Sequence, residues 1–299
     1  MITPIQNKHL IGHDNILMFF EKLIKCGKLH NSYIFEGEYG IGKETAALYI
    51  TKMITCNGND AVLDVIAKRM QNNVLENFYY LKKDDAILIE DAKSVIEFLS
   101  KKTTARKCIV IDSAENMTVQ AANAMLKAIE DAKDTTFFLI TSFPERIINT
   151  IKSRSVVQHF KGLNTESIQK ILSELNVEID NNILEIVQFS VGLILKIDEL
   201  EKEYGFFSLL VNNIVSKQIK IDTSFKENID VVMQIIYHIF EKLFCGNYFS
   251  FAKSFIDDAD KITACYQNVC EMYKKFQLYN FDKDAFLNYV FNEINIISC

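Results

Sequence analysis

The chain has 299 residues, of which 49% are hydrophobic and 24% charged, so it is long enough and apolar enough for two or three globular domains. Its formal net charge of -6 argues against a protein that wraps broadly around nucleic acid, and DNA contacts should be local or made by partners. Neither a signal-peptide pattern nor an apolar run of the ~18–20 residues needed to span a membrane is found, which predicts a cytoplasmic protein without membrane contact.

The first half of the chain alternates helical patterns with short apolar runs typical of buried strands. The helical patterns cover about residues 14–26, 45–50 and 120–132, and the strand-like runs cover 32–36, 108–111, 136–141 and 156–160. Strands that alternate with helices predict an α/β domain with a mostly parallel sheet covered on both sides. This domain should occupy roughly residues 1–162.

The strand patterns stop after Gly162. Capping residues followed by helical spacing predict a small three-helix unit over residues 163–205. Helical spacing continues over residues 206–299, which predicts a third, all-α part. The chain should therefore consist of one α/β domain followed by two helical parts.

Residues 37–44 have the spacing of a phosphate-binding loop, G-x-x-x-x-G-K-[ST], up to the last position. Gly37, Gly40 and Gly42 would let backbone N–H groups surround phosphate oxygens. Lys43 would add a positive charge. The preceding strand-like run and the following helical pattern are the context that this motif requires.

The last position of the motif holds Glu44 instead of the hydroxyl that normally binds Mg²⁺. A carboxylate there adds a negative charge beside the phosphates. Thr45, one residue later, would point about 100° away around the helix. The loop therefore predicts a degenerate nucleotide site, at which ATP and Mg²⁺ could still bind but hydrolysis is not expected.

Polar residues that end the next strand-like runs are the other candidates for this site. Asp112 stands where an acidic motif would hold the water shell of Mg²⁺, and Thr141 where a side chain could sense the terminal phosphate. Ser113 replaces the glutamate that usually activates the attacking water, and a serine cannot act as that base. Glu115 could substitute for it, but a solvent-exposed loop acid is the expected alternative.

Cysteines and basic residues give weaker indications. The seven cysteines include no C-x-x-C pair, so neither a disulfide framework nor a zinc site is expected. The basic residues within 101–107 could contact DNA locally, although such a charge run is more often a solvated loop.

Three segments, residues 29–37, 117–130 and 150–155, resemble the delta-prime subunits of bacterial DNA polymerase III clamp loaders, a division of the AAA+ superfamily. The resemblance implies an AAA+ P-loop (RecA-like) domain at 1–162, a small helical lid at 163–205 and a helical collar for oligomerisation at 206–299. It also implies partners: gamma/tau ATPase and delta subunits in a five-subunit ring, the sliding clamp, and primer–template DNA.

The same resemblance implies roles for two basic residues. Arg154 matches the arginine that family members insert into the ATP site of the neighbouring subunit, where its guanidinium would fork onto phosphate oxygens. Lys196 keeps the positive charge at the position where the lid often carries a phosphate-sensing arginine. The chain would then belong to the DNA-directed DNA polymerase III holoenzyme without hydrolysing ATP alone.

Two alternatives stay open. The chain could be a working AAA+ ATPase, either the motor subunit of such a loader or a related remodeller, that uses Lys43, Asp112 and Thr141. It could also be a degenerate AAA+ scaffold that acts only in assembly. Glu44 and Ser113 argue against the first alternative, and Arg154 argues against the second.

Overall fold

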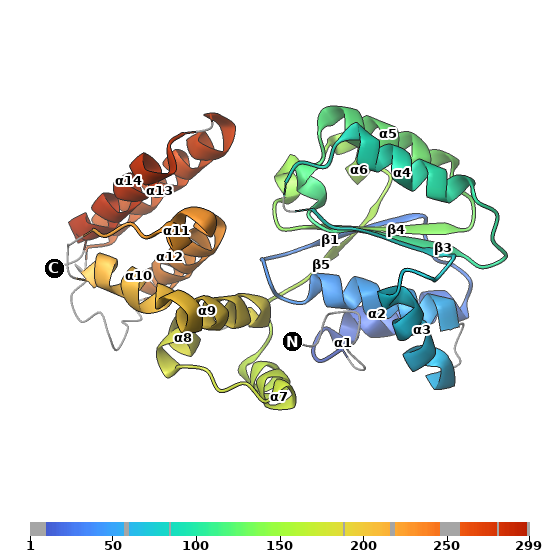
Figure 1. The fold of residues 1–299 in the computed structure, drawn as a ribbon, viewed down its shortest axis with the longest axis horizontal. Coiled ribbons are helices and arrows are strands. Elements are labelled where there is room, and N and C mark those ends of the chain that lie inside the picture. Colours follow the sequence, from blue (N-terminus) through green and yellow to red (C-terminus); the bar gives the residue numbers. More distant parts are fainter. Residues whose placement is uncertain are drawn as a thin grey trace. The chain divides into compact units, whose positions relative to one another are not determined.

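The computed structural model describes residues 10–56, 60–83, 85–187, 189–215, 219–245, 258–279 and 281–297. They form two compact units that divide between Asn176 and Val177. The first unit contains the sheet, and the second is built from helices in the residues described (Figure 1).

The sheet of the first unit has five strands within the described residues, in the order β2-β3-β4-β1-β5, and every pairing is parallel. The strands are β1 (Ser32–Glu36), β2 (Phe78–Leu81), β3 (Lys107–Ile111), β4 (Thr135–Thr141) and β5 (Val156–His159). Parallel strands place all their carboxyl ends at one edge of the sheet, where ligands bind in open α/β sheets.

Helices cover both faces of this sheet. In Figure 1, α1, α2 and α3 lie on one face, and α4, α5 and α6 lie on the other. The helices of this unit are α1 (Asp14–Lys25), α2 (Lys43–Cys56), α3 (Leu63–Gln71), α4 (Ile89–Ser100), α5 (Val119–Asp131), α6 (Asn149–Lys152) and α7 (Thr165–Leu175). A sheet that is covered on both sides buries its strands along their length, and every residue of β3 and β4 is buried, with apolar runs at residues 108–111 and 137–140.

Alternate strand residues build two apolar layers. Tyr33, Phe35 and Phe138 pack toward α1 and α2, where the Phe20 ring lies 4.8 Å from the Tyr33 ring between centroids. Ile34 packs on the opposite layer, against α4 and α5. This two-residue period follows from strand geometry, because successive side chains point to opposite faces.

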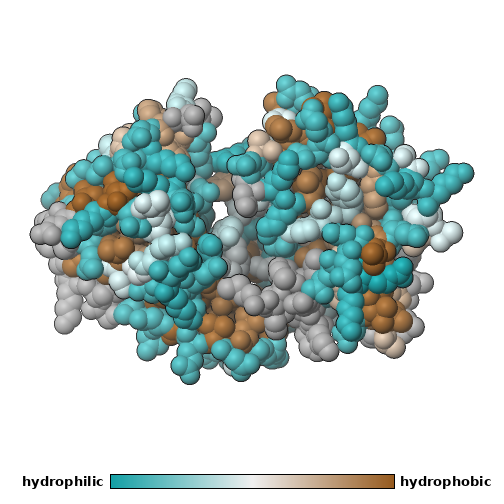
Figure 2. All heavy atoms as spheres, in the orientation of Figure 1, coloured by the Kyte–Doolittle hydropathy of each residue, from teal (hydrophilic) through white to brown (hydrophobic). Residues whose placement is uncertain are grey.

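The second unit is all-helical in its described residues. Its helices are α8 (Asn181–Ile186), α9 (Val191–Tyr204), α10 (Phe206–Val215), α11 (Thr223–Glu227), α12 (Ile229–Phe244), α13 (Ala259–Tyr279) and α14 (Lys283–Ile297). Phe206, Phe225 and Phe291 are fully buried, and the Phe206 and Phe225 rings meet edge to face. On the face drawn in Figure 2, hydrophilic residues cover most of the surface of both units, and hydrophobic residues form separate small groups.

The predicted fold class, a mostly parallel α/β sheet followed by helical parts, is confirmed. The predicted strands and the three helices between residues 163 and 205 are all present. The sequence patterns did not predict β2, α3 and α4, and β2 and the residue after it contribute Tyr80 and Lys82 to the site described below. The division at 162/163 and 205/206 stays a prediction.

Candidate functional site

The candidate site lies at the carboxyl edge of the sheet, where residues 37–44 connect β1 to α2. The parallel register brings the residues that follow three other strands to the same edge. These residues are Lys82 after β2, Asp112 after β3 and Ser142 after β4. Asp112 thus lies at the same sheet edge as the loop, its role at a nucleotide site stays a prediction, and Lys82 was not among the residues predicted from the sequence.

The side chain of Lys43 is buried and folded back on its own loop. Its Nζ donates hydrogen bonds to the carbonyl oxygens of Gly37 (2.7 Å) and Glu38 (2.5 Å) and to Ser142 Oγ (3.1 Å). Burial lowers the pKa of Lys43 to about 8, although the carboxylates of Glu115, Asp112 and Glu38 oppose that shift. The loop carbonyls and Ser142 thus bind the ammonium that a phosphate group would need.

The lowered pKa of Lys43 predicts a stability change with pH. Below pH 8 both the folded and the unfolded chain carry the proton; between about pH 8 and 10.5 the folded chain has lost it and the unfolded chain has not. The free energy of unfolding therefore rises with pH in this window. Relative to Lys43→Met, the wild type should gain about 2 kcal/mol between pH 7 and pH 9.5 in urea unfolding. An unchanged difference would contradict the shifted pKa.

Both oxygens of the Glu44 carboxylate are bonded. Tyr80 donates its hydroxyl hydrogen to Oε1, and Lys82 Nζ lies 2.9 Å from Oε2. The same Lys82 Nζ lies 3.0 Å from Asp112 Oδ2. Glu44 and Asp112 occupy the two motif positions that would serve a metal ion, and Lys82 bridges them.

Lys82 and Tyr80 were missed because the sequence analysis did not recognise β2. The signal was the apolar run of residues 78–81 followed at once by a basic residue, the same strand-then-polar pattern that identified Asp112. Half of the β2 residues are only partly buried, which weakens the pattern of a buried strand.

Glu115 is not the solvent-exposed acid that was expected. Its Oε1 accepts a hydrogen bond of 3.1 Å from the backbone N–H of Ser142, and its Oε2 is buried without a hydrogen-bond partner among the described residues. Glu115 is also the largest of the charges that raise the pKa of Lys43. Thr141 is buried, and its Oγ1 accepts a hydrogen bond from the N–H of Phe143 (3.0 Å).

The glycine positions of the loop have conformations that side chains would strain. Gly37 has φ +153°, and a Cβ there would lie 2.5 Å from the carbonyl oxygen of Phe160. Gly40 and Gly42 also have positive φ. His13 supports the loop from the segment before α1, because its Nε2 lies 2.8 Å from the carbonyl oxygen of Ile41.

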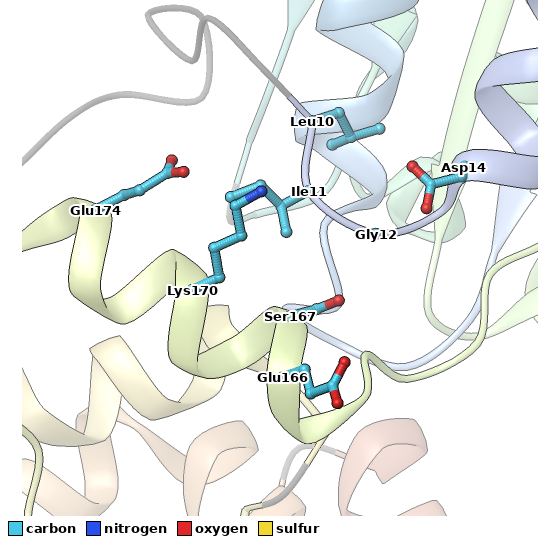
Figure 3. A pocket seen from close by; sticks show the side chains of 8 residues that line it. All are labelled: Leu10, Ile11, Gly12, Asp14, Glu166, Ser167, Lys170 and Glu174. Atoms are coloured by element: carbon cyan, nitrogen blue, oxygen red, sulfur yellow. The ribbon is translucent and has the colours of Figure 1, made fainter.

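An open pocket of about 460 Å³ lies next to His13 within the first unit. Its lining comes from two segments, residues 10–14 and α7 (Figure 3). Asp14, Glu166 and Glu174 outnumber Lys170, so the charge of this pocket disfavours a phosphate group.

Arg154 lies just after α6, on the surface. Its Nε pairs with Glu130 Oε1 at the end of α5, and its Nη1 donates to the carbonyl oxygen of Thr150 (3.1 Å) and to Ser153 Oγ (3.2 Å). The side chains of Arg154 and Glu130 are 43% and 40% exposed, so the pair is accessible to solvent and to other molecules.

The structure also locates the other residues that the sequence singled out. Arg106 and Lys107, the last basic residues of the 101–107 cluster, bond backbone carbonyls and Thr136 inside the first unit and so are not free for DNA. Lys196 lies on α9 of the second unit, 3.4 Å from Glu199 Oε2, and its role as a phosphate sensor stays a prediction. Thr45 follows Glu44 on α2, half-buried.

The profile of the protein family described as "DNA polymerase III, delta subunit" matches residues 12–164 of the chain. The chain belongs to this family. The match spans the sheet, the glycine loop and Arg154, and it includes all three segments that carried the resemblance in the sequence, residues 29–37, 117–130 and 150–155.

Individual relatives agree with this family. The chain is 30% identical to "DNA polymerase III subunit delta'" of Bacillus subtilis over 183 residues, which cover 56% of each protein. It is 29% identical to "DNA polymerase III subunit gamma/tau" of Mycoplasma genitalium over 202 residues, 63% of this chain and 34% of that protein. The chain therefore matches about a third to just over half of the length of these relatives.

A solved structure shares the fold. It is that of a DNA polymerase III gamma subunit-related protein of Thermotoga maritima, with a TM-score of 0.50 at 15% identity, and the likeness covers 93% of this chain and 99% of that one. None of the helices in the described ranges combines the length and apolar composition required to cross a membrane.

Proposed function

We propose that this chain is a delta-prime-like subunit of a bacterial DNA polymerase III clamp loader. In this role it hydrolyses no ATP itself and donates Arg154 to the ATP site of a neighbouring gamma/tau-type subunit. With delta it would complete a five-subunit ring that loads the sliding clamp onto primer–template DNA. Family membership supports a place in this complex. The position of Arg154 supports a role at the ATP site of a neighbouring subunit.

The observation that carries the proposal is the distance of Arg154 from its own glycine loop. Arg154 precedes β5, whose first residue, Val156, pairs with Tyr33 near the start of β1, whereas the loop follows the far end of β1. A strand rises about 3.3 Å per residue, so the backbone of Arg154 lies on the order of 15 Å from the loop. This separation supports a role at another subunit's site.

The contacts of Arg154 are compatible with its release to a partner. Its ion pair with Glu130 is solvent-exposed on both sides, and such pairs contribute about 0–1 kcal/mol. In the free subunit, Glu130 would hold the Arg154 guanidinium near the surface. In the complex, a phosphate group of the ATP bound to the neighbouring subunit would replace the Glu130 carboxylate, because an arginine forms two parallel hydrogen bonds with either group.

The chain's own loop has features that argue against the alternative of a working ATPase. Glu44 and Asp112 are both bound to Lys82, Thr141 is buried, and Ser113 cannot act as a base. Glu115, an acid near Lys43, is the candidate that the sequence offered for that role, but it accepts a hydrogen bond from the backbone N–H of Ser142. The scaffold alternative leaves the exposed Arg154 without a function.

The proposal is tested by ATP turnover of the isolated full-length chain, repeated after a gamma/tau-type ATPase subunit is added. We expect the chain alone to show no ATP turnover above background. The mixture should hydrolyse ATP, and this activity should be lost when the P-loop lysine of the added subunit, the counterpart of Lys43, is replaced. Steady hydrolysis by the chain alone that Lys43→Ala abolishes would establish the working ATPase instead. Circular dichroism of the variant controls for loss of folding.

A further inference from the structure

Lys82 joins the two acidic residues that define the metal position of this site. Glu44 stands at the motif position of the magnesium-binding hydroxyl, and Asp112 directly follows β3, where an acidic residue would hold the ion's water shell. The Lys82 ammonium lies 2.9 Å from one carboxylate and 3.0 Å from the other. A nitrogen at hydrogen-bond distance from both side chains occupies the region between them.

A magnesium ion does not fit these residues as they are arranged. Mg²⁺ needs near-octahedral oxygen ligands at about 2.0–2.1 Å, so an ion bound by both carboxylates would lie within a few ångströms of the ammonium. Repulsion between the ion and the ammonium opposes such binding. The described residues also contain no group of three or more His, Cys, Asp or Glu side chains arranged to hold a metal.

We propose that the Lys82 ammonium takes the place of the divalent cation in this P-loop site, so that the site excludes Mg²⁺ and Mn²⁺. The lysine supplies one positive charge, which partly neutralises the two negative charges of Glu44 and Asp112. Its position is fixed by β2, which pairs with β3 and ends directly before Lys82. The inference requires only the geometry around Lys82. It goes beyond the proposed function, which requires that this chain hydrolyse no ATP but not that its site exclude divalent cations.

The surroundings keep Lys82 protonated and hold the Glu44 carboxylate in position. Burial lowers the pKa of Lys82, but the Asp112 and Glu44 carboxylates outweigh that effect and raise it above its ordinary value. Tyr80 donates its hydroxyl hydrogen to the other oxygen of Glu44, and burial and the carboxylate raise the pKa of Tyr80, so it remains a donor. Each oxygen of the Glu44 carboxylate thereby accepts a hydrogen bond from a side chain of β2 or the residue after it.

The test is a Mn²⁺ titration of the full-length chain, with free Mn²⁺ followed by electron paramagnetic resonance. The wild type should show no specific Mn²⁺ site up to roughly 1 mM Mn²⁺, a concentration at which weak carboxylate sites for divalent cations begin to fill. Lys82→Arg keeps the positive charge and should behave in the same way. Lys82→Met should gain a site at least about 10-fold tighter, and adding Asp112→Asn to it should remove that site again.

Either of two results would overturn the proposal. One is Mn²⁺ binding by the wild type as tight as that of Lys82→Met, and the other is no gain of binding in a folded Lys82→Met. Thermal unfolding with and without Mn²⁺ checks folding and gives a second readout, because only a variant with a metal site should be stabilised by the ion. If Lys82→Met does not fold, Lys82→Gln replaces it. Neither result bears on Arg154, whose role is read from the ATPase activity of the complex.

Discussion

Replacing Arg154 with alanine is expected to lower the clamp- and DNA-stimulated ATPase activity of the assembled complex while leaving assembly intact. The guanidinium stays charged and presents donors in a fork that matches phosphate oxygens, so in the proposed role its loss would remove stabilisation of the transferring phosphoryl group. Arginines that act in trans on GTPases contribute on the order of 10³–10⁵ in rate. We expect about a 10³-fold loss at the site that Arg154 serves, measured by steady-state ATP turnover, with assembly checked by size-exclusion chromatography.

Matched variants separate this role from a general effect of charge. Lys152→Ala removes a positive charge two residues away and should leave turnover near the wild-type level. Arg154→Lys keeps the charge but not the fork and should recover little activity. Glu130→Gln releases the cis ion pair and should not lower turnover. Wild-type activity in a complex that contains Arg154→Ala would show that the arginine serves no neighbouring site.

The sequence predicted the parts of the fold that local patterns specify. The strands β1, β3 and β4 are apolar runs buried on both faces, and the glycine loop has a fixed spacing, so both were recognisable from residues alone. The short strand β2 was not predicted, because a run of four apolar residues does not by itself distinguish a strand from part of a buried helix. The register between strands decides which side chains lie together at the edge of the sheet. That register cannot be predicted when one of the strands is not recognised.

Local sequence patterns do not predict the contacts that define the site, because these contacts join residues far apart in the chain. Lys82 and Glu44 are 38 positions apart, and the parallel order β2-β3-β4-β1 brings the segments that follow β2 and β1 to the same edge of the sheet. Glu115 was expected in solvent because it follows a strand in a loop, but a short 3-10 turn over Ala114–Asn116 directs it to Ser142. The identity of Glu44 correctly indicated an unusual site, whereas its partners Tyr80 and Lys82 required the structure.

Replacing Arg106 with alanine is expected to destabilise the first unit, and not merely to weaken a DNA contact. Its Nε donates to Thr136 Oγ1 (2.8 Å), and its Nη2 donates to the carbonyl oxygens of Leu29 (3.1 Å) and Thr135 (3.0 Å). These bonds tie the segment before β1 to β4. Each hydrogen bond to a charged group contributes about 1.5–3 kcal/mol, and we expect a net loss of about 3 kcal/mol because truncation leaves acceptors unpaired and water compensates in part.

The neighbouring exposed lysine provides the matched control for Arg106. Lys102 lies in the same basic cluster, and Lys102→Ala should change the free energy of unfolding by no more than about 0.5 kcal/mol. Urea unfolding of both variants, followed by circular dichroism, measures the difference. If the cluster served DNA alone, both substitutions would leave stability unchanged and weaken DNA binding to a similar degree. A large loss of stability confined to Arg106→Ala would instead assign this arginine to the sheet, and any DNA contact would then have to come from the exposed lysines beside it.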